Sequence, residues 1–157
     1  MNFNIPPILA VILIAMSPIF ELRGAIPVAI WVYRMNPFDA FLLSFLGNIL
    51  PIAPLLLFLS PMEGWLRRYR IFDEFFKWLF KRTQRRLSDD VAKYKALALC
   101  LFVAIPLPAT GAWTGCAAAF IFGLKFRHAF PAIVIGVFIA GILVTLASIG
   151  VITLWDL

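Results

Sequence analysis

The sequence predicts an all-α integral membrane protein that forms a single membrane domain over residues 1–157. Of these 157 residues, 63% are hydrophobic and only 14% are charged, and the mean hydropathy is +0.97. A soluble domain carries about a quarter charged residues. The apolar residues gather in four long segments, and two of these segments are interrupted near their middle. These observations set both the class and the architecture.

The apolar segments cover residues 5–33, 37–60, 96–124 and 129–155. The second and fourth have no charged residue over 41–60 and 129–155. A helix needs about 20 apolar residues to cross the hydrocarbon core of a bilayer. Each of these two segments is therefore predicted to form one spanning helix.

The first and third segments are too long for one crossing and too short for two. ELRGAIP (21–27) interrupts the first, and IPLPATGAWTG (105–115) interrupts the third. Proline removes a backbone donor, glycine frees the backbone, and backbone groups freed inside lipid need protein or water as partners. Each segment is predicted to be a re-entrant helical hairpin that enters the membrane, turns and leaves on the same side. Two full tilted crossings per segment are the alternative.

The order of elements predicts two inverted repeats joined by a linker. Residues 1–60 form the first repeat, 61–95 the linker and 96–157 the second repeat. Gly24 aligns with Gly111, and Gly47 falls near Gly136. Each repeat crosses the membrane once, so the two have opposite orientations. Inverted repeats with broken helices are typical of transporters.

Basic residues are distributed unevenly, and this predicts the orientation. One side holds Arg67, Arg68, Arg70, Lys77, Lys81, Arg82, Arg85, Arg86, Lys93, Lys95, Lys125 and Arg127, whereas the other holds Arg34. By the positive-inside rule, the linker is cytoplasmic and both termini lie outside. Basic residues placed in this way set topology and form no basic face on a soluble fold, so nucleic-acid binding is not expected.

The linker itself is patterned as an amphipathic helix. Aromatic and aliphatic residues recur at helical spacing over residues 65–80, with Arg and Lys between them. Such a helix lies in the headgroup layer of the membrane. It can bind anionic lipids or cover the cytoplasmic mouth of a cavity. A solubilising connector that fixes the topology is the alternative that we favour.

Glu21 and Arg23 are the strongest candidates for function. Ionisable residues inside a membrane are costly and usually face a partner or an aqueous cavity. At positions i and i+2 they point to different sides of a regular helix, so we expect a break at Gly24 to turn both toward one cavity. Glu21 can exchange a proton, while Arg23 stays charged and can bind phosphate or carboxylate through its planar fork. A purely structural ion pair is the alternative.

The second interruption carries no charge. Thr110 and Thr114 can bond backbone groups freed at the turn, and Trp113 is predicted to form an aromatic wall of the cavity. Pro106 and Pro108 enforce the break and are included in the predicted site. That they only shape the turn is the alternative interpretation. The charges of the predicted site therefore come from the first hairpin.

Three further residues complete the predicted site. Helix N-termini near Pro27 and Gly111 would direct positive dipole ends toward an anion. Asn48 lines the cavity or makes an interhelical hydrogen bond. The predicted substrate- and proton-binding residues are Glu21, Arg23, Gly24, Pro27, Asn48, Pro106, Pro108, Thr110, Gly111 and Trp113.

Enzymatic chemistry has little support in the sequence. There is no HExxH or GxSxG motif and no intramembrane pair of aspartates, and His128 is the only histidine. Cys100 and Cys116 lie in apolar runs without CxxC spacing and are predicted to be packing residues. We expect no catalytic residue, no metal and no cofactor.

ELRGAIP and PLPATGAWTG, in this order and spacing, resemble the two signature stretches of the "putative small multidrug export" family. That family is similar to the DedA/VTT superfamily, whose members have paired re-entrant hairpins and include proton-dependent carriers of lipid phosphates. The resemblance implies that Glu21 is the acidic residue of the first hairpin. DedA-type proteins place arginines in the second hairpin, where this chain has AIPLPATGAWTG.

These observations leave three functions open. The first is a proton-coupled transporter or flippase for an amphipathic or lipid-like substrate or drug, in the cytoplasmic membrane of a prokaryote. The second is a DedA-like translocase of a lipid phosphate such as polyprenyl phosphate, and the third is a non-transporting scaffold or assembly factor. Membrane lipids, the substrate and protons are the expected partners. A homodimer is also expected, because the chain is short for a complete translocation path.

Overall fold

The computed structural model describes residues 6–66, 89–107 and 110–155. These residues form α1 (Pro7–Met16), α2 (Glu21–Pro27), the π-helix η1 (Val28–Val32), α3 (Pro37–Ile49), α4 (Ile52–Leu66), α6 (Asp89–Ala104), α7 (Ala112–Ile121) and α8 (Phe126–Trp155). No strand occurs among the described residues, which confirms the predicted all-α class. Pro108 and most of the predicted amphipathic linker, residues 67–88, lie outside the described residues.

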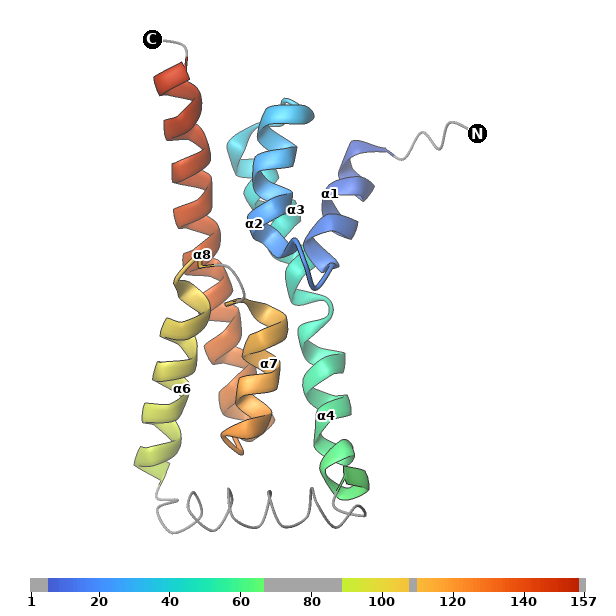
Figure 1. Ribbon diagram of the computed structural model, residues 1–157, viewed down its shortest axis with the longest axis vertical. Coiled ribbons are helices and arrows are strands. Elements are labelled where there is room, and N and C mark those ends of the chain that lie inside the picture. Colours follow the sequence, from blue (N-terminus) through green and yellow to red (C-terminus); the bar gives the residue numbers. More distant parts are fainter. Residues whose placement is uncertain (1–5, 67–88, 108–109, 156–157) are drawn as a thin grey trace.

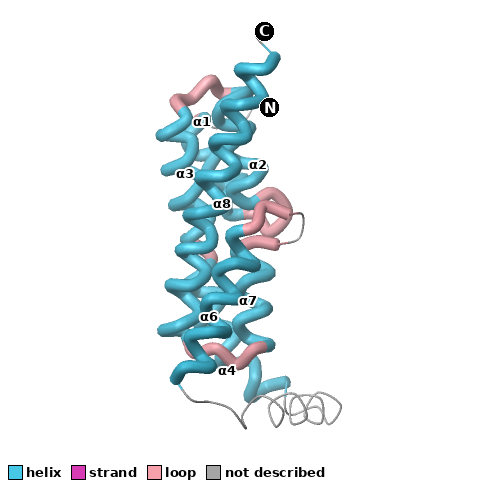
Figure 2. Tube along the Cα trace, turned by 90° about the vertical axis from the view of Figure 1, so that its left-hand side faces the viewer, coloured by secondary structure: helices cyan, strands magenta, loops and turns pink. Residues whose placement is uncertain are grey.

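Two helical hairpins meet near the middle of an elongated molecule (Figure 1). Hairpin 1 consists of α1 and α2–η1, and hairpin 2 consists of α6 and α7. Their turns approach each other, and their open ends point to opposite ends of the long axis. The view in Figure 2 shows loops at both ends of the molecule and at its middle. The long helices α3–α4 and α8 run beside the hairpins.

The turn of hairpin 1 lies before the predicted break. The segment ELRGAIP forms α2, so the predicted break at Gly24 is wrong, and the chain turns at residues 17–20 instead. Ser17 closes this turn, because its hydroxyl donates to Ile14 O at 2.8 Å and accepts from Phe20 N at 3.2 Å. Pro18 cannot continue α1, since it has no backbone donor.

Pro27 alters the helix without ending it. The predicted helix N-terminus near Pro27 is wrong, because Pro27 is the last residue of α2 and the chain continues directly into η1. Proline cannot donate to the carbonyl four residues earlier, and the next turn widens to π geometry. Tyr33 N, for example, donates to Val28 O at 3.2 Å.

The second apolar segment forms two helices where one was predicted. The chain is interrupted at Leu50 and Pro51, between α3 and α4, because Pro51 cannot supply the helical hydrogen bond. In the described part of the chain, Pro37–Leu59 and Phe126–Val151 are long and apolar enough to cross a membrane. Helix α4 also continues past the predicted boundary at residue 60, and α6 begins at Asp89, inside the predicted linker.

Glycines let the long helices pack closely on the hairpins. A Cβ at Gly47 of α3 would lie 2.9 Å from the Ile12 carbonyl oxygen of α1. A Cβ at Gly136 of α8 would lie 2.7 Å from the Cys100 carbonyl oxygen of α6. Small residues at helix interfaces allow such backbone approach in membranes. The first helix of each hairpin is thus held by the long helix that follows the hairpin.

Candidate functional site

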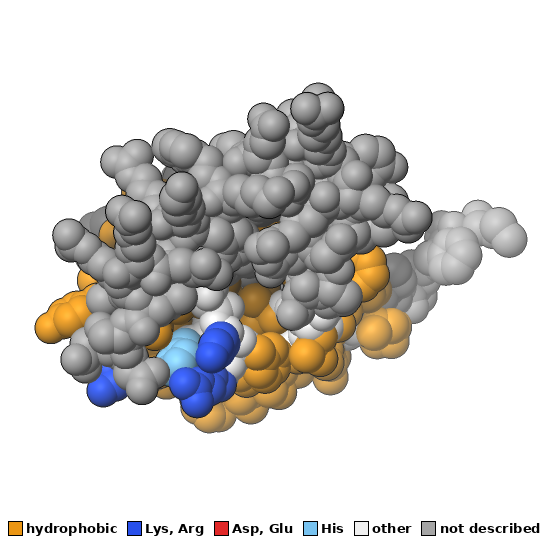
Figure 3. Space-filling view, turned by 90° about the horizontal axis from the view of Figure 1, so that it is seen from below, with side chains coloured by type: hydrophobic (Ala, Val, Ile, Leu, Met, Phe, Trp, Pro, Cys, Tyr) orange, Lys and Arg blue, Asp and Glu red, His pale blue; other side chains and the backbone are white. Residues whose placement is uncertain are grey.

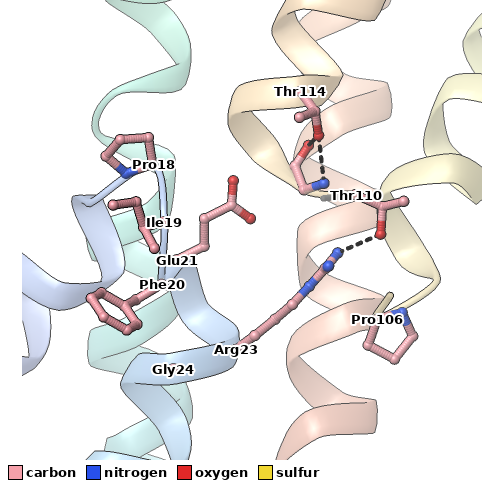
Figure 4. Close-up of a pocket in the computed structure, with 10 residues that line it drawn as sticks. Pro18, Ile19, Phe20, Glu21, Arg23, Gly24, Pro106, Thr110 and Thr114 are labelled. Atoms are coloured by element: carbon pink, nitrogen blue, oxygen red, sulfur yellow. Dashed lines mark hydrogen bonds between the residues drawn. The ribbon is translucent and has the colours of Figure 1, made fainter. Parts of the chain in front are cut away.

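A cavity of about 410 Å³ lies where the turns of the two hairpins meet. It is lined by Pro18, Ile19, Phe20, Glu21, Arg23, Gly24, Pro106, Thr110, Gly111 and Thr114. Figure 4 shows that Glu21 points toward the beginning of α7, while Arg23 extends toward Thr110. Both charged residues of the cavity come from hairpin 1, and their partners come from hairpin 2.

The Glu21 carboxylate binds the N-terminus of α7. It accepts hydrogen bonds from Ala112 N at 3.3 Å and from Trp113 N at 3.1 Å, and the residue is only 7% exposed. The first N–H groups of a helix have no partner within the helix and carry partial positive charge. The φ angle of Glu21 is 49°, a left-handed conformation that is unusual for a residue with a side chain. A buried anion is thus placed where a helix end can stabilise it.

Gly111 provides the space for this contact. A Cβ at this position would overlap the Glu21 carboxylate. Gly111 has an extended backbone with φ −176°, so the requirement is for space and not for an unusual conformation. Its N–H donates to Thr114 Oγ1 at 2.8 Å, which caps the helix from inside. The Trp113 indole donates to Met16 O at 3.2 Å and ties α7 to the end of α1.

Arg23 binds the chain that follows α6. Its guanidinium donates to the carbonyl oxygens of Leu107 and Ile105, the second at 3.3 Å, and to Thr110 Oγ1 at 3.0 Å. These carbonyls are available because the helix ends at Ala104 and Pro106 has no N–H to continue it. A cation at the C-terminus of a helix is stabilised by the helix dipole. Arg23 therefore acts as a cap for α6.

The two charged residues bind the ends of different helices at the turn of hairpin 2. Glu21 lies at the positive end of α7, and Arg23 lies at the negative end of α6. This arrangement differs from the structural ion pair that was the alternative interpretation. It also shows why the second interruption needs no charge of its own, since its helix ends supply the complementary partial charges.

The structure brings together only part of the predicted site. Pro106 and Thr110 line the cavity with the charged pair, whereas Pro27, Asn48 and Trp113 are not among the residues that line it. Asn48 is fully buried, and its amide, like the Ser44 hydroxyl one turn earlier, has no hydrogen-bond partner in the described residues.

Other residues of the site were missed. The carbonyls of Ile105 and Leu107 and the apolar wall at Phe20 were not predicted as site residues. Thr114 was expected to bond backbone groups at the turn, and it accepts from Gly111 N and also lines the cavity. The IPLP motif was the available signal for the carbonyls, because closely spaced prolines end the helix and the carbonyls after its end lie outside the helical hydrogen-bond pattern.

The described residues offer no alternative centre for metal chemistry. No group of three His, Cys, Asp or Glu side chains occurs among them. Cys100 and Cys116 are buried free cysteines. The chemistry available in the cavity is that of one carboxylate, one guanidinium and two threonine hydroxyls.

The sequence was also compared with known proteins. The family described as "Putative small multi-drug export protein" matches residues 21–143, which is more than half of the chain. The match begins at Glu21 and includes both interruptions. No curated protein and no solved structure matches the chain.

Proposed function

The chain belongs to this small multi-drug export family, and we propose that it is a proton-coupled membrane transporter or flippase. Its substrate occupies the cavity between the hairpin turns, where Glu21 exchanges the proton and Arg23 holds an anionic or polar group. The family and the two long apolar helices agree with a small membrane transporter. The residues of the cavity support the more specific mechanism.

The observation that carries the proposal is the contact between the Glu21 carboxylate and α7. Hydrogen bonds to a charged acceptor are stronger than those to a neutral one. Protonation of Glu21 removes the charge and weakens the bonds from Ala112 N and Trp113 N. The junction between the hairpins then loosens and gives the substrate access. Proton binding is in this way coupled to opening of the cavity.

Arg23 supplies the affinity for a substrate. In the described part of the chain its hydrogen bonds go to neutral oxygens, and the nearby Glu21 carboxylate attracts its positive charge only through space. A phosphate or carboxylate can form paired hydrogen bonds with a guanidinium. The substrate anion competes with the Ile105 and Leu107 carbonyls for these donors, and its binding also loosens the junction.

The arrangement of helices supports a re-entrant, inverted-repeat mechanism. We infer that the hairpins enter the membrane from opposite sides, with the termini outside and the linker in the cytoplasm. The opposite directions of the open ends in Figure 1 and the matching glycine contacts of Gly47 and Gly136 agree with this inference. Movement of one repeat against the other then exposes the cavity to each side in turn.

The test uses the purified protein in liposomes with an imposed pH gradient and dodecyl phosphate as the probe. The native protein should accumulate the probe in proportion to the gradient. Glu21→Gln keeps the size and polarity of the side chain but cannot release a proton, so uptake should lose its dependence on the gradient while binding remains. An unchanged pH profile in this variant would show that Glu21 does not couple to protons.

The same contacts also agree with a non-transporting scaffold, because Glu21 and Arg23 join the two hairpins. A scaffold needs the contacts to be permanent. If the folded native protein takes up no probe under any gradient, and Glu21→Gln only lowers its thermal stability, the scaffold is the better description.

A further inference from the structure

A second cavity of about 410 Å³ adjoins the first along hairpin 1. It is lined by apolar residues, among them Ile14, Phe20, Gly24, Val28, Trp31 and Val32. Among the side chains that line this cavity, Trp31 is the one with a polar hydrogen, and its indole already donates that hydrogen to Ser148 O at 3.2 Å. The lining side chains of this cavity therefore hold a ligand through apolar contacts and not through hydrogen bonds.

The two cavities share their boundary. Phe20 and Gly24 line both of them, whereas Glu21 and Arg23 line only the polar one. Residues 20, 24, 28 and 31 recur at helical spacing, so the apolar cavity follows one face of α2 and η1 away from the hairpin turn. A charged region thus continues directly into an apolar one.

Gly24 makes room for Phe20 at this boundary. A Cβ there would lie 2.9 Å from Phe20 Cβ and 3.2 Å from Phe20 Cδ1, closer than side chains normally approach. Because Gly24 has no side chain, Phe20 can lie against α2 with cavity on both sides. Glycine in the middle of a helix lowers its stability. At this position the lack of a side chain is what allows Phe20 to lie between the two cavities.

We propose that the apolar cavity binds the hydrocarbon tail of a single-chain amphiphile whose anionic head group lies beside Arg23. This inference rests on the proposed function, since it assigns a substrate class to the same site. The polar cavity accepts a charged group that the membrane core excludes, and the adjoining cavity accepts the attached chain. The apolar cavity that adjoins the polar one through Phe20 and Gly24 accommodates one tail per head group.

Trp31 allows the tail to be located directly. The probe is dodecyl phosphate with bromine on its last carbons, added to the full-length protein in nanodiscs. Bromine quenches indole fluorescence on contact, so the emission of Trp31 should fall on binding. The quenched component should be missing in Trp31→Phe, although the other four tryptophans remain.

A second measurement tests binding of the tail separately from binding of the head group. Val28→Phe fills the apolar cavity without altering any residue of the polar one. It should weaken binding of dodecyl phosphate roughly tenfold, the loss expected when about two methylenes are displaced. Binding of ethyl phosphate should not change. Val151→Phe, the same substitution at an exposed position of α8, is the control and should leave both ligands unaffected.

The outcomes distinguish this inference from the proposed function. If both phosphates bind and depend on Arg23, but neither quenching of Trp31 nor an effect of Val28→Phe appears, the tail lies elsewhere and only the polar site stands. If dodecyl trimethylammonium binds as well as dodecyl phosphate, or if Arg23→Gln leaves phosphate binding intact, the head group does not lie beside Arg23. The assignment of the tail to the apolar cavity depends on that position and is then wrong as well.

Discussion

At the scale of single residues, Glu21 and Arg23 add partners to the two helix ends at the turn of hairpin 2. Gly111 precedes α7 and has no side chain to accept from the first N–H groups, and Glu21 supplies the acceptor. Arg23 in turn adds donors to the carbonyls after α6, which also accept from the Thr110 hydroxyl. Burial of a charge is costly unless hydrogen bonds and opposite charge compensate it. Here the helix ends provide the compensation.

This arrangement predicts how the two residues combine in stability. Glu21→Ala should lower the free energy of unfolding by about 1–3 kcal/mol, because it leaves Ala112 N and Trp113 N without their acceptor. Arg23→Ala should cost less, about 0.5–1.5 kcal/mol, because the carbonyls after α6 still accept from Thr110 Oγ1. Since their hydrogen-bond partners differ and only an attraction through space links the two charges, the double variant should lose slightly less than the sum. Denaturant unfolding of the purified protein measures all three values. Recovery of stability in the double variant would instead indicate a direct ion pair.

Gly111 offers a test of the close contact with the Glu21 carboxylate. Gly111→Ala should displace Glu21 from α7 and lower the free energy of unfolding by about 1–3 kcal/mol. Gly150→Ala is the matched control, because a Cβ at Gly150 meets no atom within 4 Å. There the change should be neutral or stabilising by up to about 1 kcal/mol, since alanine favours the helix. Thermal unfolding in detergent compares the two, and equal effects would contradict the contact.

At the scale of elements, each long helix is fitted to its hairpin through a glycine. Gly47 and Gly136 face backbone carbonyls, which cannot move without moving a helix. Gly141 instead faces the ring of Phe41, whose Cε2 would lie 2.7 Å from an added Cβ. Phe41 also packs edge-on against Phe138 at a centroid distance of 5.5 Å. The three positions should therefore differ in how strongly a substitution by alanine destabilises the protein.

The expected order follows from what each new methyl group meets. Gly47→Ala and Gly136→Ala should each destabilise the protein by about 1–3 kcal/mol through overpacking. Gly141→Ala should cost less, because a ring can rotate away from the added atom. Thermal unfolding of the three variants under one condition gives the order. A larger loss at Gly141 than at the other two would contradict the packing described here.

The limits of the sequence are visible in the same elements. Hydropathy is enough to predict the helical membrane class, and the Pro- and Gly-containing motifs lie next to both turns. The position of the first turn was wrong because Gly24 and Pro27 can be accommodated in a helix, while Ser17 and Pro18 end one. The contacts from Glu21 to α7 depend on a left-handed residue and on distant backbone groups, and neither appears in a pattern of side chains.

At the scale of the whole molecule, charge separates the two ends. Lys93 and Lys95 lie near the beginning of α6, Lys125 lies just before α8 and Arg127 lies in its first turn, so these residues share one end. Seen from that end in Figure 3, Lys and Arg side chains lie beside the histidine. Arg34 follows η1 at the opposite end. This distribution agrees with a cytoplasmic location of the lower end in Figure 1.

The orientation can be tested with single cysteines at the two ends, in a background in which Cys100 and Cys116 are replaced by alanine. Asp39→Cys lies in the first turn of α3, and Lys125→Cys lies between α7 and α8; both positions are exposed. An impermeant thiol reagent added to intact cells should label Asp39→Cys only, because basic loops remain in the cytoplasm. After permeabilisation both should react, which controls for accessibility. Labelling of Lys125→Cys alone on intact cells would reverse the orientation, and labelling of both would mean that the chain does not separate these ends across the membrane.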